Sequence, residues 1–239
     1  MLIAIINQSN GKVSDADVLK MTSAIADQIR VDVAPVWDRP PASVISYGTL
    51  SGEAELREKV PPQAHGITIV ENIPDQPKGV LGYHTEDQGG KIWGIVAAAP
   101  SLDNGAKTTT GDWSVSSILS HEVLEMYVDP NCNLWASDGK TRNYSFEVCD
   151  PVEAPTYDVD GVSVSNFVTP AWFDPLAADN GKTSFDRLGQ LHAPFTKVSA
   201  GYFVYASAGK EKQEGGEDIP EWRRASKGNP FARTRRRLS

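Results

Sequence analysis

Apolar residues near the start of the chain alternate between continuous runs and helically spaced stripes. Residues 2–6 are all apolar, which is typical of a strand buried on both faces. After Ser14, a predicted N-cap, apolar residues recur at helical spacing to about Arg30. Residues 31–37 then alternate between apolar and polar positions. The pattern therefore predicts a strand, a helix and a second strand.

Short strands dominate the pattern over the next sixty or so positions. Residues 44–47 and 67–70 have strand character, whereas residues 51–60 fit either a helical turn or a loop. Residues 81–84 and 91–97 flank a polar, glycine-rich connection. That spacing predicts a hairpin or an adjoining pair of strands.

The most regular helical pattern lies between Ser114 and Pro130. Its apolar positions are Val115, Ile118, Leu119, Val123, Leu124 and Met126. This spacing is helical rather than alternating. Because proline cannot continue a helix, we expect the helix to end at Pro130.

The last third of the chain is predicted to be rich in strands. Residues 156–168 indicate a β-hairpin because Asp160 and Gly161 form a strong turn signal between alternating flanks. Residues 201–205 predict a final strand.

Composition then divides the chain into a body, a linker and a tail. We expect the folded body to cover residues 1–208, with subdomains of about 1–130 and 131–208. Residues 209–221 are largely polar and predict a linker. Residues 222–239 form a basic tail.

Three polar residues of the predicted helix carry its candidate chemistry. His121 and Glu125 are four residues apart, so their side chains project from one face of the helix. Glu122 is adjacent to His121 and rotated by roughly 100° about the axis. Imidazole and carboxylate groups one turn apart can hold a divalent metal, while Glu122 can take a proton from a water activated by the ion. The alternative is an ordinary solvated polar face.

Residues 121–125 resemble the H-E-x-x-H helix of zincin metallopeptidases, with glutamate in place of the second histidine. With the predicted order of elements, the resemblance covers roughly residues 1–150. It implies an α+β fold in which a twisted mixed sheet lies over the active-site helix, followed by a β-rich C-terminal part. Catalysis would then depend on Glu122 as general base.

The resemblance also implies an antiparallel edge strand that binds extended substrate by strand addition. In this chain that role falls on residues 91–97, with Trp93 and Gly94 as substrate-binding residues. His84 lies on a preceding strand that borders the expected cleft, where it steers substrate. The alternative for His84 is an ordinary surface histidine.

A catalytic zinc site needs three protein ligands and an open position, so a third ligand is expected after the helix. In a continued helix Asp129 would lie about 12 Å along the axis from His121, but Pro130 lets the chain turn back. Local hydrogen bonding at the helix end is the other role open to Asp129. Glu147 and Asp150 lie in a second acidic group downstream. The third ligand is therefore Asp129, Glu147 or Asp150.

The expected metal is Zn²⁺, held by His121, Glu125 and that third ligand. A carboxylate in place of the second imidazole also suits harder ions, so Ca²⁺ or Mn²⁺ is an alternative. Loss of the site, or a metal-bound but inactive site, is the remaining interpretation.

The net charge of −8 is unevenly distributed. Seven basic residues and no acidic residue follow position 222, so residues 1–222 carry −15. A basic tail can bind a polyanion or another protein, whereas the acidic body argues against nucleic-acid binding outside residues 222–239. The candidate partner-binding residues are Arg223, Arg224, Arg235, Arg236 and Arg237.

Composition and cysteine content indicate a soluble globular protein without a disulfide framework. Cys132 and Cys149 are the only cysteines, which favours free thiols in a reducing compartment. No run approaches the roughly 18 apolar residues of a membrane helix, so no membrane contact is expected. Residues 1–6 lack the features of a signal peptide. We expect a cytoplasmic protein, or a virion protein if the gene is carried by a phage.

The sequence over roughly residues 80–205 also resembles an uncharacterised family of bacterial and bacteriophage proteins. The similarity lies in the active-site helix, in the segment from Glu147 to Glu153 and in residues 164–173. Two functional hypotheses follow. The first is a zincin-like metal-dependent hydrolase acting on peptides or proteins. The alternative is a non-catalytic virion or assembly component that docks on other virion proteins through its basic tail.

Overall fold

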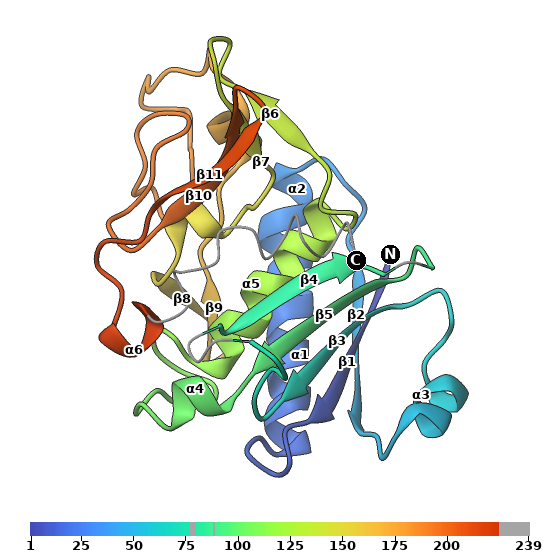
Figure 1. The fold of residues 1–239 in the computed structure, drawn as a ribbon. Coiled ribbons are helices and arrows are strands. Elements are labelled where there is room, and N and C mark those ends of the chain that lie inside the picture. The colour runs from blue at the N-terminus through green and yellow to red at the C-terminus, as the bar shows by residue number, and fades with distance from the viewer. Residues whose placement is uncertain (77–79, 88, 225–239) are drawn as a thin grey trace.

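The computed structural model describes residues 1–76, 80–87 and 89–224, which form an α+β fold (Figure 1). Its helices are α1 (Asp15–Gln28), α2 (Ala34–Val36), α3 (Glu53–Lys59), α4 (Ala99–Leu102), α5 (Val115–Val128) and α6 (Glu221–Arg224). Its strands are β1 (Leu2–Gln8), β2 (Ser43–Thr49), β3 (His65–Val70), β4 (Gly82–Glu86), β5 (Ile92–Ala97), β6 (Trp135–Ser137), β7 (Asn143–Ser145), β8 (Thr156–Val159), β9 (Val162–Ser165), β10 (Tyr202–Ser207) and β11 (Lys210–Gly215).

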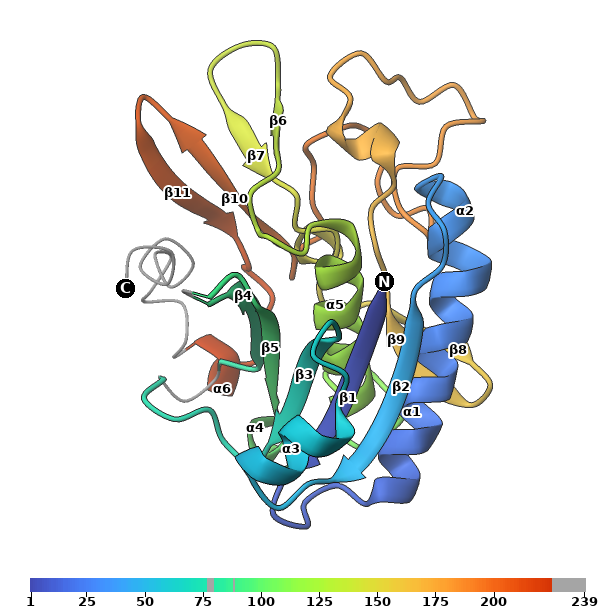
Figure 2. The same ribbon diagram turned by 90° about the vertical axis from the view of Figure 1, so that its right-hand side faces the viewer.

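The first half of the chain builds a five-stranded mixed sheet in the order β2-β1-β3-β5-β4. Four strands run parallel, and β4 runs antiparallel to β5. Successive residues of β1 alternate between two apolar clusters, because side chains along a strand point to opposite faces. One cluster contains residues of α1 and α5, and the smaller one lies beside α3 (Figure 2).

The predicted hairpin of residues 81–84 and 91–97 is confirmed, but the assignment of the edge strand is wrong. β5 lies between β3 and β4, so residues 91–97 are internal to the sheet. The antiparallel strand at the end of the order is β4. Strand order depends on pairing between distant segments, and no local pattern distinguishes these two neighbours.

The predicted strand at residues 31–37 is also wrong. The chain continues from α1 through a π-helical turn, Ile29–Val33, into α2. Ile25, Ile29 and Val33 are fully buried, and each follows the previous one by four residues. This stripe continues the apolar face of α1. Burial of that face therefore favours a helix over the strand that the alternating pattern predicts.

Helix α5 lies between the sheet and the C-terminal half of the molecule. It contacts β4 and β5 on one side and β9 on the other. Ser114 caps its N-terminus by accepting a hydrogen bond from the Ser117 amide. From Ser114 to Asp129 every residue is buried except His121. Because the helix is surrounded in this way, each polar side chain that it buries costs free energy unless it has a hydrogen-bonding or charged partner.

The C-terminal half contains the predicted hairpin and a second sheet. β8 and β9 pair across Asp160 and Gly161, which both have positive φ, as a two-residue hairpin turn requires. The second sheet has the order β11-β10-β7-β6. Figure 1 shows it beyond the end of α5, away from the first sheet.

The linker predicted for residues 209–221 is instead structured. β11 pairs with β10 along its whole length, after a turn at Ala208 and Gly209 with positive φ at both positions. Its polar side chains point toward solvent or lie half-buried, so the backbone pairing, not burial, holds the strand. Of the basic tail, Trp222, Arg223 and Arg224 lie in α6, and Arg235, Arg236 and Arg237 lie outside the described residues.

Two further expectations concern the cysteines and membrane spans. Cys132 and Cys149 are both buried, and neither forms a disulfide, as predicted. Among the described residues, no helix combines the length and apolar character that crossing a bilayer requires.

Candidate metal centre

The centre begins with the one partly exposed residue of α5. His121 and Glu125 lie one turn apart, and His121 Nε2 is 3.4 Å from Glu125 Oε1. Glu125 is buried and accepts a hydrogen bond of 3.2 Å from the Cys149 amide. The predicted pairing of imidazole and carboxylate on one helical face is confirmed.

The third group arrives from the second acidic segment. Asp150 opens a 3₁₀ turn, Asp150–Val152, that follows β7. Its Oδ1 lies 3.2 Å from His121 Nε2, and its side chain is buried. Because the Cys149 amide is bonded to Glu125, the segment that carries Asp150 is tied directly to the helix.

The spacing of these three groups fits a shared divalent cation. One ligand atom from each of His121, Glu125 and Asp150 lies within 4.8 Å of the other two. Bonds of about 2.0–2.2 Å that meet at the tetrahedral angle hold ligand atoms about 3.3–3.6 Å apart. The two separations from His121 Nε2, 3.4 and 3.2 Å, are close to that range. One nitrogen and two carboxylate oxygens suit Zn²⁺ and also Mn²⁺.

Burial makes this cluster strongly basic. Desolvation, followed by the neighbouring Glu125 charge, raises the pKa of Asp150 to about 7. Desolvation alone would lower the pKa of His121, but Glu125 and Asp150 outweigh it and raise that pKa well above the ordinary value. Burial also raises the pKa of the Cys149 thiol, which keeps it protonated. The centre therefore attracts a cation, whether a proton or a metal ion.

Glu122 lies beside this cluster and is also buried. It lines the same pocket as His121, together with Leu81 and Gly82 at the start of β4. A Cβ atom at Gly82 would lie 2.6 Å from Glu122 Oε1. Glycine at this position therefore leaves the space that the carboxylate occupies.

His84 reaches Glu122 from β4 and is buried rather than on the surface. Its Nε2 lies 3.0 Å from the Asp129 carbonyl oxygen, which can only accept, so Nε2 carries the hydrogen. Its Nδ1 faces Glu122 Oε2 at 3.8 Å. The structure thus places His84 behind Glu122, and His84 does not line the pocket.

Several predicted site residues lie elsewhere. The Asp129 carboxylate accepts hydrogen bonds from the Asn133 and Leu134 amides, so the alternative role at the helix end holds. Two groupings of His and carboxylate residues among the described residues could hold an ion, His121–Glu125–Asp150 and His84–Glu122–Glu125, and Glu147 belongs to neither. Trp93 packs over Gly66 with the smaller apolar cluster, on the opposite face of the sheet from α5.

Gly94 lies on the α5 side of the sheet but underneath the site. A Cβ atom there would lie 3.3 Å from both His84 Cβ and Met126 Cε. Gly94 therefore allows close packing of β5 against α5, and direct contact with substrate is not supported.

Three residues beside the centre were missed from the sequence: Trp113, Glu153 and Tyr202. They line one pocket of about 50 Å³ with His121, Glu122 and Arg223. Glu153 lies three residues after Asp150 and was visible in the acidic segment. Trp113 and Tyr202 carry no local signal, because tertiary folding alone brings them to α5.

The chain was compared with protein-family models, curated proteins and solved structures, and none of them matches. The geometry of the site is therefore the basis for the functional proposal.

Proposed function

We propose that the protein is a metal-dependent hydrolase of zincin-like architecture, with His121, Glu125 and Asp150 as the metal ligands. One observation carries this proposal: a carboxylate from a distant segment lies beside the imidazole that the helix already places next to Glu125. Two buried acids, Glu125 and Asp150, beside a partly exposed imidazole are costly without a cation. The mixed sheet over α5 supports the same architecture.

The bound ion would supply Lewis-acid activation of water and of a substrate carbonyl. Glu122 lines the pocket beside His121 and is placed to accept the proton of the attacking water and pass it to the leaving group. His84 lies behind Glu122, 3.8 Å from its carboxylate. The burial of both groups excludes bulk water from the proton transfer.

An extended peptide is the substrate that the surrounding elements favour. β4 ends the described sheet, and Leu81 and Gly82 at its start line the pocket. A peptide that pairs with an edge strand gains backbone hydrogen bonds independent of its sequence. In this proposal β4 takes the role expected from residues 91–97, and a peptide paired with the start of β4 would pass close to His121 and Glu122.

A second candidate function is a non-catalytic component that retains the architecture. The observation that favours it is the small pocket, about 50 Å³, into which Arg223 of the same chain projects. A peptide side chain that enters beside His121 would have to displace Arg223. Docking on virion proteins or nucleic acid through the tail belongs to this alternative.

Metal binding separates these possibilities most directly. We expect the purified full-length protein to bind one divalent ion, with Zn²⁺ preferred over Mn²⁺ and Ca²⁺ in calorimetric titrations. Asp150→Asn should weaken binding by about a hundredfold or more, since even residues behind a metal ligand contribute 10–100-fold. Glu147→Gln is the matched control. It neutralises a buried acid of the same segment that does not belong to the His121–Glu125–Asp150 group.

Two results would count against the proposal. One is a folded wild-type protein that binds none of the three ions. The other is equal loss of affinity in Asp150→Asn and Glu147→Gln, because the third ligand would then be unassigned. Cleavage of a labelled unfolded protein such as casein by the metal-loaded enzyme distinguishes the hydrolase from the non-catalytic alternative.

A further inference from the structure

A buried cation from the end of the described chain lies in the pocket. Arg223 of α6 donates from Nη2 to Glu153 Oε1 at 2.5 Å, and the two side chains are 14 % and 8 % exposed. These residues are 70 apart in sequence. The contact therefore depends on the route of the chain through β10 and β11 back to the site.

The walls around this cation suit a guanidinium group. The Trp113 ring lies under Arg223 with 5.8 Å between the guanidinium carbon and the ring centroid. A carboxylate at one edge and an aromatic face are the features that recognise arginine rather than lysine. Tyr202 adds a third side, and burial raises the pKa of its hydroxyl well above the ordinary value, so it stays neutral.

Trp113 is held in this place at a conformational cost. Its φ of 61° lies in the left-handed region, which is unfavourable for a bulky residue. Such positions persist where the surrounding structure determines them, often at binding sites. Here Trp113 immediately precedes Ser114, the N-cap of α5, and its ring also contacts Trp222 edge to face.

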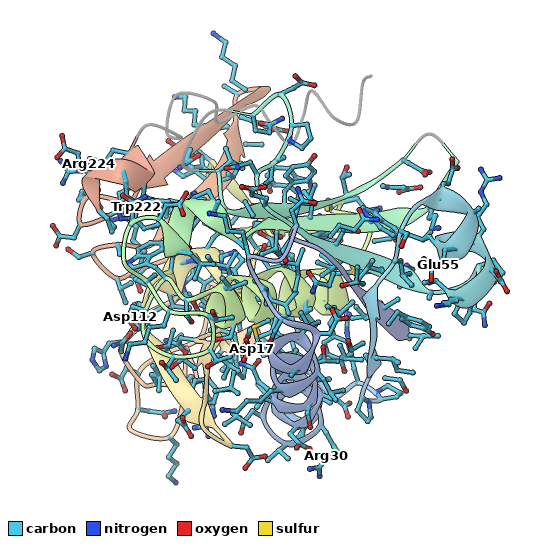
Figure 3. The ribbon with its side chains drawn as sticks, turned by 90° about the horizontal axis from the view of Figure 1, so that it is seen from below. Asp17, Arg30, Glu55, Asp112, Trp222 and Arg224 are labelled. Carbon is cyan, nitrogen blue, oxygen red and sulfur yellow. The ribbon has the colours of Figure 1, made fainter. Side chains whose placement is uncertain are left out.

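Arg223 lies close to the proposed metal centre, so the pocket and the centre are neighbours. Glu153 follows Asp150 by three residues, and the pocket that holds Arg223 is also lined by His121 and Glu122. A side chain in this place therefore lies beside the proposed reacting groups. Figure 3 shows Trp222 and Arg224 on the same side of the molecule, opposite Glu55 of α3.

We propose that this pocket is a binding site for the arginine side chain of a peptide, and that Arg223 of the chain itself occupies it. The inference names the substrate class of the hydrolase proposed above and rests on that function for the reaction that follows binding. The occupant and a substrate arginine compete for one space, because Arg223 lines the same pocket as His121, Glu122 and Glu153.

The test uses full-length Arg223→Ala and two small probes, Nα-acetyl-arginine amide and the neutral isostere Nα-acetyl-citrulline amide. Binding is measured by calorimetry and by the fluorescence of the tryptophans. We expect Arg223→Ala to prefer the arginine probe by about tenfold or more, as for a charge-assisted hydrogen bond to a buried carboxylate. Wild type should bind neither probe, because Arg223 is present at a high effective concentration.

Two further variants serve as controls. Arg224→Ala removes the neighbouring arginine, whose side chain bonds the Ile219 carbonyl, and should behave as wild type. Arg223→Ala combined with Glu153→Gln should lose the preference for arginine over citrulline. Arg223→Gln keeps the length of the side chain without its charge and should show the same preference as Arg223→Ala.

Equal binding of both probes to a folded Arg223→Ala protein, or binding of neither, overturns the proposal. Unfolding of both Arg223→Ala and Arg223→Gln also overturns it, because Arg223 would then be a structural ion-pair partner. Measurements with chelator and with Zn²⁺ separate the two proposals. A preference for arginine without metal binding would retain the pocket and reject the hydrolase, and metal binding without the preference would do the reverse.

Discussion

The proposed metal centre and the neighbouring arginine pocket both bury charged side chains. The ratio of acidic to basic groups differs between them. In the centre, one imidazole faces two carboxylates, Glu125 and Asp150. In the pocket, one guanidinium faces one carboxylate at 2.5 Å. Each cluster includes one acid from the short segment that runs from Asp150 to Glu153: Asp150 opens the 3₁₀ turn, and Glu153 directly follows it.

In our interpretation this difference separates a site that favours a bound cation from one in which the chain supplies its own cation. Two buried carboxylates with one imidazole retain negative charge even when the imidazole is protonated, and burial penalises that charge. The Arg223–Glu153 pair is neutral as a unit, so it is stable without a ligand. In our proposals the first cluster accepts a metal ion, and the second is a binding pocket with an internal occupant.

The largest expected effect concerns Glu122, which lines the pocket between the two clusters. Glu122→Gln should reduce peptide turnover by about 10²–10⁴-fold, the usual contribution of a general base. Metal affinity should stay within a fewfold of wild type, because Glu122 is not one of the three ligands. The measurement compares casein cleavage and Zn²⁺ titration in the same preparations. Turnover at the wild-type rate would remove Glu122 from the mechanism.

The next prediction is that removing an acid changes the free energy of unfolding in opposite directions in the two clusters. In the metal-free protein, Glu153→Gln should lower the free energy of unfolding by about 3–5 kcal/mol, because it leaves Arg223 buried without its carboxylate. Asp150→Asn should instead raise that free energy near pH 8, because it removes one of two mutually repelling acids. Urea denaturation of both variants with chelator present measures the difference. Destabilisation of similar size in both would show that the charge balance described above does not control stability.

The pH dependence of the metal-free protein follows from the same imbalance. Burial and Glu125 raise the pKa of Asp150 from 3.8 to about 7, so the folded state holds a proton that the unfolded chain releases. Stability should therefore fall as pH rises from about 4 to about 7, by at most about 4 kcal/mol. The raised pKa of His121 acts in the same direction above about pH 6.5.

Denaturation series at several pH values, with chelator, measure this slope. The matched variant is Asp150→Asn, in which most of the difference should disappear. Saturating Zn²⁺ should stabilise wild type more at pH 8 than at pH 5, because the ion displaces the bound protons. A wild-type slope identical to that of Asp150→Asn would exclude Asp150 as the responsible group.

The parts of the site that could be predicted from sequence are those fixed by local geometry. The spacing of His121 and Glu125 determines that both side chains project from one face of a helix, whatever surrounds it. The cap at Ser114, the stop at Pro130 and the hairpin at Asp160 are likewise local. The third ligand stayed open among three acids, since only the folded chain brings Asp150 to α5.

The errors arose where two local patterns compete or where distant pairing decides. Residues 31–37 satisfy both alternation and four-residue spacing, and the buried face of α1 selects the helix. β11 has no apolar stripe, so its existence depends on the backbone of β10. Trp93 was assigned to substrate because β5 precedes α5, but its register turns that side chain to the far face of the sheet.

The smallest expected effect disturbs both clusters at once. A Cβ atom at Gly201 would lie 2.1 Å from the Pro151 carbonyl oxygen and 3.1 Å from that of Asp150. Gly201→Ala should therefore displace the 3₁₀ turn and cost about 1–3 kcal/mol, as overpacking generally does. The same displacement moves Asp150 away from His121 and Glu153 away from Arg223, so Zn²⁺ affinity should fall together with stability. Unchanged affinity in a destabilised Gly201→Ala protein would indicate that the turn moves without carrying Asp150, and the two clusters would then be independent.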